Sequence, residues 1–335
     1  MDSLQNVAME SRLTTSQWPD KSPEYDKFIQ LGFTMVELRG MEVFATVIEQ
    51  GSMSGAARAL SMSTSAVSQQ VRELERRGGV TLLHRSTRKL ALTEAGAHFL
   101  EDCAAMLAAA RRARQQLVQA REAPVGQLRM SAPVGFARHV APALGALLAA
   151  HPALTLRLLV DDARIDLIDA RIDLALRFGR LPDSSWVAQR LCGLEVILCA
   201  APAWLQAHGT PRHVDDLPAH QWLTIAPDDD ASLKLSLTDA ARQTRLLRIE
   251  ARISSNNQLS IQQMCVAGLG LARLARGDVH DDLVAGRLVP ILPQWALAPL
   301  DVWAVTPQRD AQPAKVRHAI DALQRYLRAQ PGVLP

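Results

Sequence analysis

One stretch of this chain places hydroxyl, amide and guanidinium side chains on a single face of an expected helix. In helical steps, the members of this stripe fall at i, i+3, i+4, i+7 and i+11: Ser65, Ser68, Gln69, Arg72 and Arg76. Such groups can hydrogen-bond to base edges in the DNA major groove, and Thr64 at the helix start joins them. Any solvated helix face can carry Ser, Gln and Arg, so the stripe alone leaves both interpretations open.

A second cluster of cations and hydroxyls follows between two short apolar segments. Its sequence is His84-Arg85-Ser86-Thr87-Arg88-Lys89, and Val80–Leu83 and Leu90–Leu92 flank it as expected strands. A hairpin tip with three permanent cations can bind backbone phosphates and reach the minor groove. We therefore predict a basic wing whose DNA contacts are Arg85, Ser86, Thr87, Arg88 and Lys89.

Two expected helices must position the stripe. They are Ser54–Leu60 and Thr64–Arg77, and Ser63 in the break between them can cap the second helix. The face of the second helix that lies opposite the stripe is apolar and should pack against the first, through Val67, Val71 and Leu74. Met35–Gln50 has apolar residues at helical spacing, which predicts a supporting core helix.

At this point the chain resembles the LysR-type transcriptional regulators. The stretch GSMSGAARALSMSTSAVSQQVRELERRGGVTLLHRSTRKLALTEAG contains the AAxxL, SAVSxxVxxLE, RSTR and LTEAG patterns of that family. Met53 and Leu83 stand where the family usually has Phe, and Thr64 where it often has Gln. The resemblance implies a winged helix-turn-helix over residues 35–92 that binds double-stranded operator DNA, and Thr64 could alter base preference.

Composition agrees with a DNA-binding protein. The chain has 335 residues and a formal charge of +3, and residues 35–92 hold eight Lys or Arg against five Asp or Glu. Residues 1–34 are polar and lack a secretory pattern, so we expect a mobile N-terminal extension, or a mis-set start with Met35 as initiator. No segment reaches 18 consecutive apolar residues, and a cytoplasmic location is expected.

The cysteines are scattered and give no metal-binding spacing. They are Cys103, Cys192, Cys199 and Cys265, without a C-x-x-C pair. We interpret them as buried thiols in a reducing compartment, with Cys192 and Cys199 on adjacent strands. A redox pair is the less favoured alternative, and no metal or cofactor is expected.

A helix of nearly thirty residues should follow, from Thr93 to about Glu122. Its apolar seam is too long for a small winged domain to bury, so it calls for a partner helix, with Phe99, Cys103, Leu107 and Leu117 at the interface. Packing against the chain's own second half is the alternative. The resemblance implies that this linker helix (residues 93–122) pairs antiparallel with its twin in a homodimer or a dimer of dimers.

The second half alternates expected strands and helices, which predicts βαβ units and a parallel sheet. The strands include Gln127–Ala132, Thr155–Val160 and Asp173–Arg177, and the helices include Phe136–Ala150 and Arg164–Arg171. The resemblance implies an effector-binding domain over residues 126–335, made of two Rossmann-like subdomains similar to periplasmic solute-binding proteins. Subdomain I would cover about residues 126–192 and 307–335, and subdomain II about residues 193–306.

Polar residues at the carboxyl ends of these strands and at the following helix starts are candidates for binding an effector. The set is Ser131, Pro133, Gly135, Phe136, Asp161, Arg177, Ser255, Asn256, Asn257 and Arg273. Each could equally be an ordinary cap or a surface charge. Together, two arginines and several helix starts favour a small anionic metabolite, whereas Asp161 and Asp162 argue against one.

Two other classes of function remain as alternatives. A solute-binding or transport component would use the second half alone, but the winged helix argues against it. An enzyme lacks support, because no H-E-x-x-H, P-loop or complete G-x-S-x-G pattern occurs. We therefore predict a DNA-binding regulator that is not an enzyme, and that also contacts RNA polymerase if it is an activator.

Overall fold

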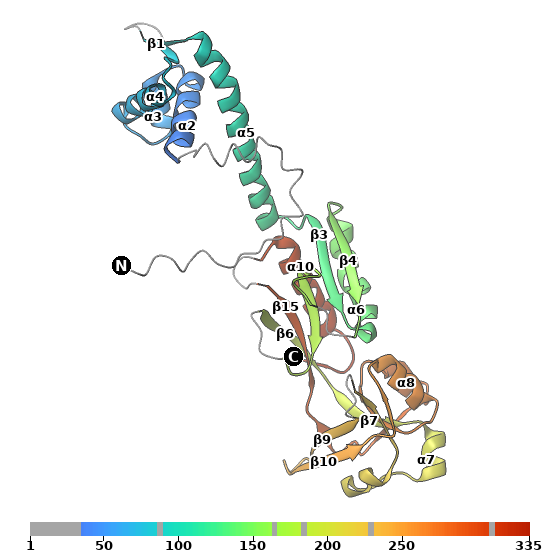
Figure 1. Ribbon diagram of the computed structural model, residues 1–335. Coiled ribbons are helices and arrows are strands. Elements are labelled where there is room, and N and C mark those ends of the chain that lie inside the picture. The colour runs from blue at the N-terminus through green and yellow to red at the C-terminus, as the bar shows by residue number, and fades with distance from the viewer. Residues whose placement is uncertain (1–34, 86–89, 163–165, 182–185, 227–230, 308–311) are drawn as a thin grey trace, which may run out of the picture. The chain divides into compact units, whose positions relative to one another are not determined.

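A computed structural model describes residues 35–85, 90–162, 166–181, 186–226, 231–307 and 312–335. The chain divides into two compact units, residues 1–115 and 116–335, and helix α5 (Glu94–Glu122) contains the boundary (Figure 1). The predicted N-terminal extension and wing residues 86–89 lie outside the described residues. No helix in the described ranges is both long and apolar enough to cross a membrane.

The N-terminal unit is a helix-turn-helix followed by a two-stranded hairpin. Its elements are α2 (Met35–Glu49), α3 (Met53–Ala59), α4 (Thr64–Gly78), β1 (Leu83–Arg85), β2 (Leu90–Leu92) and the first part of α5. The Ser52 hydroxyl accepts the Gly55 N–H at the start of α3, and the Ser63 hydroxyl accepts the Ala66 N–H at the start of α4. Gly79 ends α4 at φ 65°. The predicted cap by Ser63 is therefore confirmed.

The core of this unit forms where the three helices meet the hairpin. Val67 and Val71 of α4 are fully buried, as predicted, and they share a cluster with Phe44, Leu83 and Cys103. β1 pairs antiparallel with β2, with Leu83 opposite Leu92. The first strand is shorter and later than the predicted Val80–Leu83, because Leu82 and Leu83 donate their N–H groups to the Glu75 carboxylate.

Gly96, in the LTEAG segment, lets α5 approach the hairpin. A Cβ at this position would lie 2.1 Å from the Leu82 carbonyl oxygen, which no side chain could tolerate. Thr93 caps α5 by accepting the Gly96 N–H, and its hydroxyl donates to the Thr81 carbonyl. The start of α5 is thereby fixed against the two residues that precede β1.

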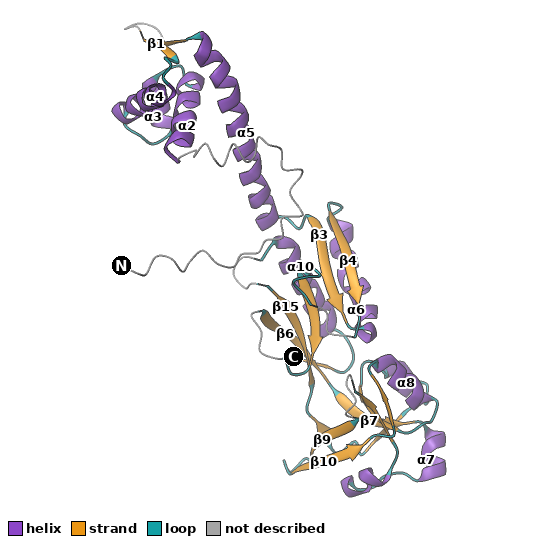
Figure 2. Ribbon diagram, viewed as in Figure 1, coloured by secondary structure: helices purple, strands orange, loops and turns teal. Residues whose placement is uncertain are grey.

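The C-terminal unit contains two lobes, one built on a single sheet and the other on two sheets (Figure 2). Lobe I has the six-stranded sheet β16-β6-β15-β5-β3-β4: β3 (Gly126–Ala132), β4 (Leu154–Val160), β5 (Leu174–Phe178), β6 (Val187–Leu194), β15 (Leu300–Thr306) and β16 (Val333–Leu334). Its helices are η1 (Val134–Phe136), α6 (Ala137–Ala150) and α10 (Ala314–Arg328). Residues of α6, α10 and the sheet form one core, which includes Leu144, Leu174 and Leu323.

Lobe II has a five-stranded sheet of order β11-β8-β12-β7-β13 and a three-stranded sheet of order β10-β9-β14. The strands are β7 (Val196–Ala200), β8 (Trp222–Ile225), β9 (Ser232–Thr238), β10 (Thr244–Glu250), β11 (Ile253–Ser255), β12 (Leu271–Ala275), β13 (Val289–Ile291) and β14 (Ala296–Leu297). The helices are α7 (Pro202–His208), η2 (Val214–Ala219), α8 (Gln258–Val266) and α9 (His280–Val284).

The chain crosses between the lobes twice, from β6 to β7 and from β14 to β15. The predicted fold class, a winged helix-turn-helix, a long helix and two α/β subdomains, is confirmed. The predicted parallel pairing is confirmed for the strands of residues 126–178, but the complete sheet of lobe I is mixed. β3 pairs parallel with β4 and β5, but β15 runs antiparallel to both β5 and β6, because it returns from the other lobe.

The predicted helix Arg164–Arg171 does not form over its described part. The Asp166 carboxylate accepts the N–H groups of Ile168 and Asp169, and Arg171 adopts a positive φ of 51°. Local side-chain hydrogen bonds thus compete with the helix and produce turns. The β9–β10 hairpin was not predicted at all.

Candidate DNA-binding and effector sites

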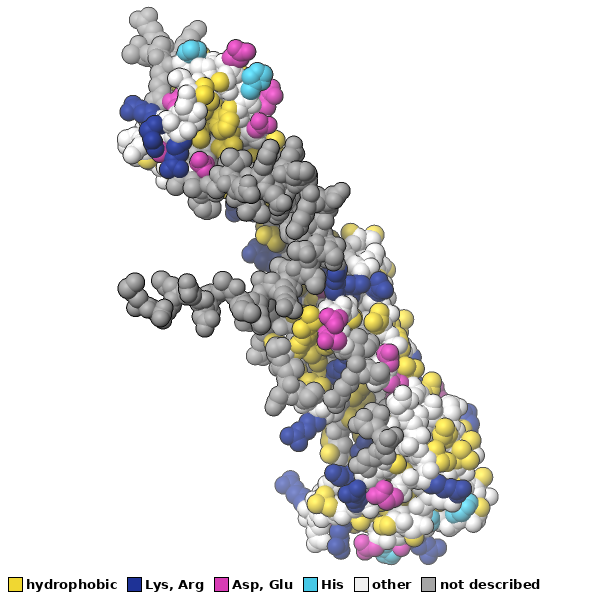
Figure 3. All heavy atoms as spheres, viewed as in Figure 1, with side chains coloured by type: hydrophobic (Ala, Val, Ile, Leu, Met, Phe, Trp, Pro, Cys, Tyr) yellow, Lys and Arg dark blue, Asp and Glu magenta, His cyan; other side chains and the backbone are white. Residues whose placement is uncertain are grey.

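The α4 face opposite the core carries most of the predicted stripe. Thr64, Ser65, Gln69 and Arg72 are exposed, whereas Ser68 is partly buried. Ser65 Oγ lies 3.0 Å from Ser63 Oγ, so the first turn of the helix holds a hydroxyl pair. Figure 3 shows Lys and Arg side chains gathered over α3 and α4. The arrangement offers hydrogen-bonding groups and cations on one accessible surface, as reading DNA requires.

The arginines of α4 are not equivalent. Glu73 accepts hydrogen bonds from Arg76 (2.5 Å and 2.7 Å) and from Arg77 (2.7 Å). These hydrogen bonds lower the pKa of the Glu73 carboxyl to about 2. Among the described residues, Arg72 has no carboxylate partner, and neither does Arg58 of α3. Arg72 and Arg58 therefore present their charge fully, whereas Glu73 offsets Arg76 and Arg77.

The hairpin is anchored to α4 by a partly buried contact. Glu75 Oε1 accepts the N–H groups of Leu82 (2.9 Å) and Leu83 (3.1 Å). This carboxylate fixes where the hairpin leaves α4. Of the predicted wing contacts, Ser86, Thr87, Arg88 and Lys89 lie outside the described residues, and Arg85 is described only as backbone in β1.

In lobe I, the structure brings together two predicted effector residues, Ser131 and Arg177. Ser131 is buried at the end of β3, and Arg177 Nη1 donates to Ser131 Oγ (3.2 Å) and to the Leu176 carbonyl (2.9 Å). Burial lowers the pKa of the Arg177 guanidinium. No described carboxylate pairs with it, so a partly desolvated cation is available to an anion.

A second group of predicted residues lies where α8 meets lobe I. Asn257 caps α8 by accepting the Ser260 N–H, and its own N–H donates to Ser255 Oγ (3.1 Å). A Cβ on Gly135 of η1 would lie 3.9 Å from the Gln258 Cβ, so the two helix starts are adjacent. Asp162 of lobe I bonds to Asn257, which makes these residues contacts between the lobes.

The remaining predicted effector residues have more ordinary positions. Pro133 precedes η1, Asp161 and Asn256 are exposed, and the Asp161 N–H donates to the Ala132 carbonyl. Phe136 is 4% exposed and its ring packs edge-on to Phe178, so it belongs to the lobe I core. Arg273 is exposed in the middle of β12, and no described contact joins it to Arg177.

Comparison with known proteins identifies the family. Residues 38–97 match the "Bacterial regulatory helix-turn-helix protein, lysR family" domain, and residues 121–328 match the "LysR substrate binding domain". The chain belongs to the LysR family of transcriptional regulators. It is 34% identical to the transcriptional activator AaeR of Escherichia coli over 295 residues, which cover 87% of this chain and 94% of AaeR.

Solved structures of LysR-type regulators have the same fold. The full-length Vibrio cholerae virulence activator AphB aligns with a TM-score of 0.67 and 28% identity, covering 86% of this chain and 99% of AphB. CrgA of Neisseria meningitidis aligns with a TM-score of 0.53 and 30% identity, covering 86% and 97%. This LysR-type protein is therefore a DNA-binding transcriptional regulator with an effector-binding domain.

The predicted dimer interface on helix α5 of this LysR-type regulator requires a correction. Phe99, Cys103 and Leu107 were predicted at a dimer interface, but all three contact the core of the N-terminal unit. Cys103 is fully buried there, and the Phe99 ring lies 5.6 Å from that of Phe44. Cys103 is therefore closed to a partner helix, whereas Phe99 and Leu107 are only partly buried and remain predicted interface residues. Leu117 is different, since 74% of its surface is exposed.

The four cysteines are buried, as predicted. Burial raises the pKa of Cys103 and of Cys192 to about 11, and a hydrogen bond with Cys265 raises the pKa of Cys199 well above its ordinary value. The expected placement of Cys192 and Cys199 on adjacent strands is wrong, because β6 and β7 belong to different sheets. Within the described ranges, no group of His, Cys, Asp or Glu could hold a metal ion.

Sequence reasoning missed three residues that matter for these sites. Arg58 and Glu75 were missed because their spacing in the sequence has no distinctive pattern. The pairing of Glu73 with Arg76 and Arg77 could have been predicted, because acids and arginines three or four residues apart on a helix attract each other. Arg138 at the start of α6 was missed because its partner, Asp278, is 140 residues away.

Proposed function

We propose that this regulator binds operator DNA as a homodimer, with a small anionic metabolite between the two lobes controlling its activity. The recognition surface would be Thr64, Ser65, Ser68, Gln69 and Arg72, with the wing residues Arg85 to Lys89 on the phosphates. The single observation that best supports this function is the exposed α4 face with the unpaired Arg72, within a domain that matches the LysR helix-turn-helix.

Dimerisation would use the C-terminal half of α5. Leu117 and Val118 are 74% and 39% exposed there, and large apolar groups on a long helix favour a partner helix. Two such subunits would place two recognition helices on half-sites of a palindromic operator. A dimer of dimers would extend this to two adjacent sites. The named relatives AaeR and AphB are activators, and an activating role here would add RNA polymerase as a partner.

The metabolite would use Arg177 and Ser131. A half-buried guanidinium without a described carboxylate partner favours a carboxylate or another planar anion, which it can bind through two parallel hydrogen bonds. Binding between the lobes would change their relative position and alter how the dimer holds its two half-sites. A solute-binding protein is not favoured, because the matched DNA-binding domain would then have no role.

Gel-shift titration with the DNA upstream of the gene tests the proposal as a whole. We expect specific binding whose affinity falls steeply with salt, and sedimentation should show at least a dimer. Leu117→Asp should reduce the mass to a monomer and abolish operator binding, because it places a charge in an apolar interface. Leu246→Asp is the matched control, since Leu246 is equally exposed but lies on β10. Unchanged mass in Leu117→Asp would contradict the proposed interface.

A further inference from the structure

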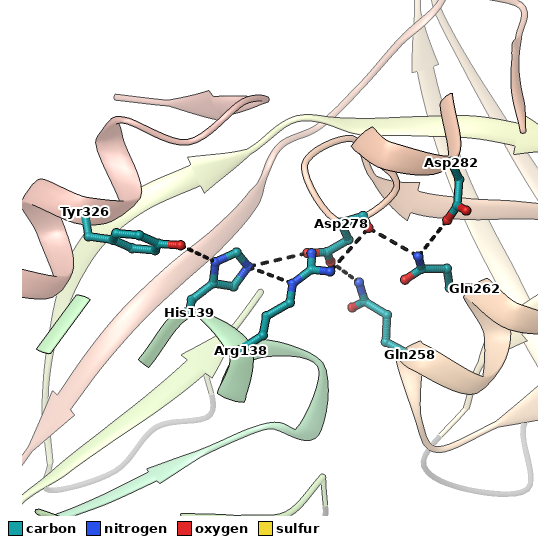
Figure 4. A network of polar contacts seen from close by, with 7 residues as sticks. All are labelled: Arg138, His139, Gln258, Gln262, Asp278, Asp282 and Tyr326. Atoms are coloured by element: carbon teal, nitrogen blue, oxygen red, sulfur yellow. Dashed lines mark hydrogen bonds and ion pairs between the residues drawn. The ribbon is translucent and has the colours of Figure 1, made fainter. Parts of the chain in front are cut away.

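Polar side chains join the two lobes of the regulatory domain, in addition to the two strand crossings. From lobe I they come from the second residue after β4 and from the start of α6. From lobe II they come from the start of α8 and from the turn after β12. These side chains form two contacts between the lobes, one through Asp162 and one through Asp278. Figure 4 shows the contact through Asp278.

Asp162 of lobe I makes the first contact. Its Oδ1 accepts the Val134 N–H at the start of η1 (2.9 Å), and its Oδ2 accepts a hydrogen from Asn257 Nδ2 in lobe II (2.5 Å). The Asn257 side chain cannot turn away freely, because its Oδ1 accepts the Ser260 N–H. One carboxylate therefore binds the start of a helix in each lobe.

Asp278 of lobe II makes the reciprocal contact. Its Oδ1 accepts a hydrogen from Arg138 Nη2 of lobe I (2.6 Å), and its Oδ2 accepts one from Gln258 of its own lobe. Gln262 donates to the Asp278 carbonyl and to Asp282, which fixes the turn (Figure 4). The Asp278 side chain is 16% exposed, so the charge is shielded from water.

The surroundings orient Arg138 but do not fill the space between the lobes. Arg138 Nε donates to His139 Nε2 (3.2 Å), and the other ring nitrogen of His139 lies 3.4 Å from the Tyr326 hydroxyl. A cavity of about 30 Å³ remains beside these residues, lined by Phe136, His139, Asp278 and others. That volume can hold one water molecule. Apolar packing is therefore incomplete at this point, and the polar contacts act beside the apolar contact of Ala275 with the lobe I core.

We infer that Asp162 and Asp278 form an inter-lobe clasp, defined by the contacts Asp162–Asn257 and Arg138–Asp278. Each carboxylate reaches from one lobe to a helix start of the other, and Asn257 and Gln258 are consecutive residues. The clasp holds the lobes in the arrangement described above. Any effector that changes this arrangement must break these contacts. The effector must therefore bind the new arrangement more tightly than the original one, and the free energy of the clasp contacts determines by how much.

Amide hydrogen exchange of the full-length protein tests the clasp without any effector. Asp162→Asn replaces one acceptor oxygen with an amino group, which must then face either the Val134 N–H or the Asn257 amide, so at least one bond breaks. Although residue 162 is in lobe I, we expect exchange in α8 of lobe II to become about tenfold faster, the effect of losing one charge-assisted hydrogen bond. Arg138→Met should likewise speed exchange in residues 276–283 of lobe II.

Asp173→Asn is the matched control. The Asp173 carboxylate also accepts a backbone N–H, that of Arg129 (2.9 Å), and it pairs with Lys315 (2.7 Å), but all three residues belong to lobe I. Exchange in α8 should stay unchanged in this variant. A second control locks the lobes, because the Cβ positions of residues 135 and 258 lie 3.9 Å apart, within the range of a disulfide.

In the oxidised Gly135→Cys/Gln258→Cys protein, Asp162→Asn should no longer speed exchange in α8, and reduction should restore the effect. Faster exchange confined to lobe I would overturn the clasp, since only a local bond would then have been lost. Equal acceleration by Asp173→Asn would also overturn it, because the cause would be reduced overall stability. Persistent acceleration in the locked protein would mean that α8 opens by itself.

Discussion

Arg72 on α4 and Arg177 on β5 are both cations without a carboxylate partner in the described chain, yet their surroundings differ. Arg72 is exposed, and its neighbours Arg76 and Arg77 are held by Glu73. Arg177 is half-buried against Ser131, and burial lowers its pKa. The first cation can form and release phosphate or base contacts with little rearrangement. The second lacks full hydration, so an anion that enters its site gains more from pairing with it.

The surrounding residues also differ in origin. Glu73, which pairs with the two other arginines of α4, is one residue away from Arg72 on the same helix. The residues around the effector site come from segments far apart in the chain, as in the bond between Asp162 and Asn257. A substitution near Arg72 should therefore change DNA affinity by a limited factor, whereas a substitution of Arg177 should abolish the response to the effector.

Arg177→Met should have the largest effect. In a thermal-shift screen with small mono- and dicarboxylates, the wild-type protein should be stabilised by at least one compound, and this variant by none, because Met keeps the volume but not the charge. Operator binding without added compound should remain, since residue 177 lies outside the DNA-binding unit. Arg190→Met is the control, because Arg190 pairs with Asp301 at the surface and should keep the shift. A full response in Arg177→Met would place the anion elsewhere.

The two sites also differ in how far the sequence could predict them. The α4 face was predictable because five residues repeat at helical spacing within one element, and Ser63 caps it as expected. The effector residues were predicted only as ends of separate strands. The sequence could not show that Asp162 binds Asn257, or that Arg138 meets Asp278, because tertiary packing brings these pairs together. Cys103 was misassigned for a related reason, since helical spacing does not say which neighbour covers an apolar seam.

Arg72→Ala should have the second largest effect. We expect operator affinity to fall by about tenfold or more, with weaker discrimination at one or two base pairs, since a good base contact contributes roughly 1–3 kcal/mol. Arg76→Ala is the matched control on the same helix, and it should cost less because Glu73 already offsets that charge. Binding-site selection measures both quantities. Equal losses in the two variants would contradict the difference proposed between these arginines.

Glu75→Gln should have a smaller effect that concerns the wing. Gln can still accept one of the two N–H bonds from Leu82 and Leu83, but without the charge. We expect affinity for all DNA sequences to fall a few-fold, with preference among bases unchanged, because the phosphate-binding hairpin is less well positioned. Competition with random-sequence DNA measures this. A change of base preference would mean that Glu75 acts through the recognition helix instead.

Glu73→Gln should have the smallest effect, and in the opposite direction. Removing this carboxylate releases Arg76 to bind a phosphate, so non-specific affinity should rise, and the slope of log affinity against log salt should steepen by about 0.9 for this new contact. Because its two arginines hold the pKa of Glu73 near 2, below the ordinary 4.5, the carboxylate stays ionised as the pH falls from 8 to 5. Its contribution is present above pH 4.5 and is lost only as the pH approaches 2. The difference in slope between wild type and variant should therefore be the same at pH 8 and pH 5. Glu49→Gln removes the same charge from α2, away from the α4 arginines, and should leave the slope closer to that of the wild type.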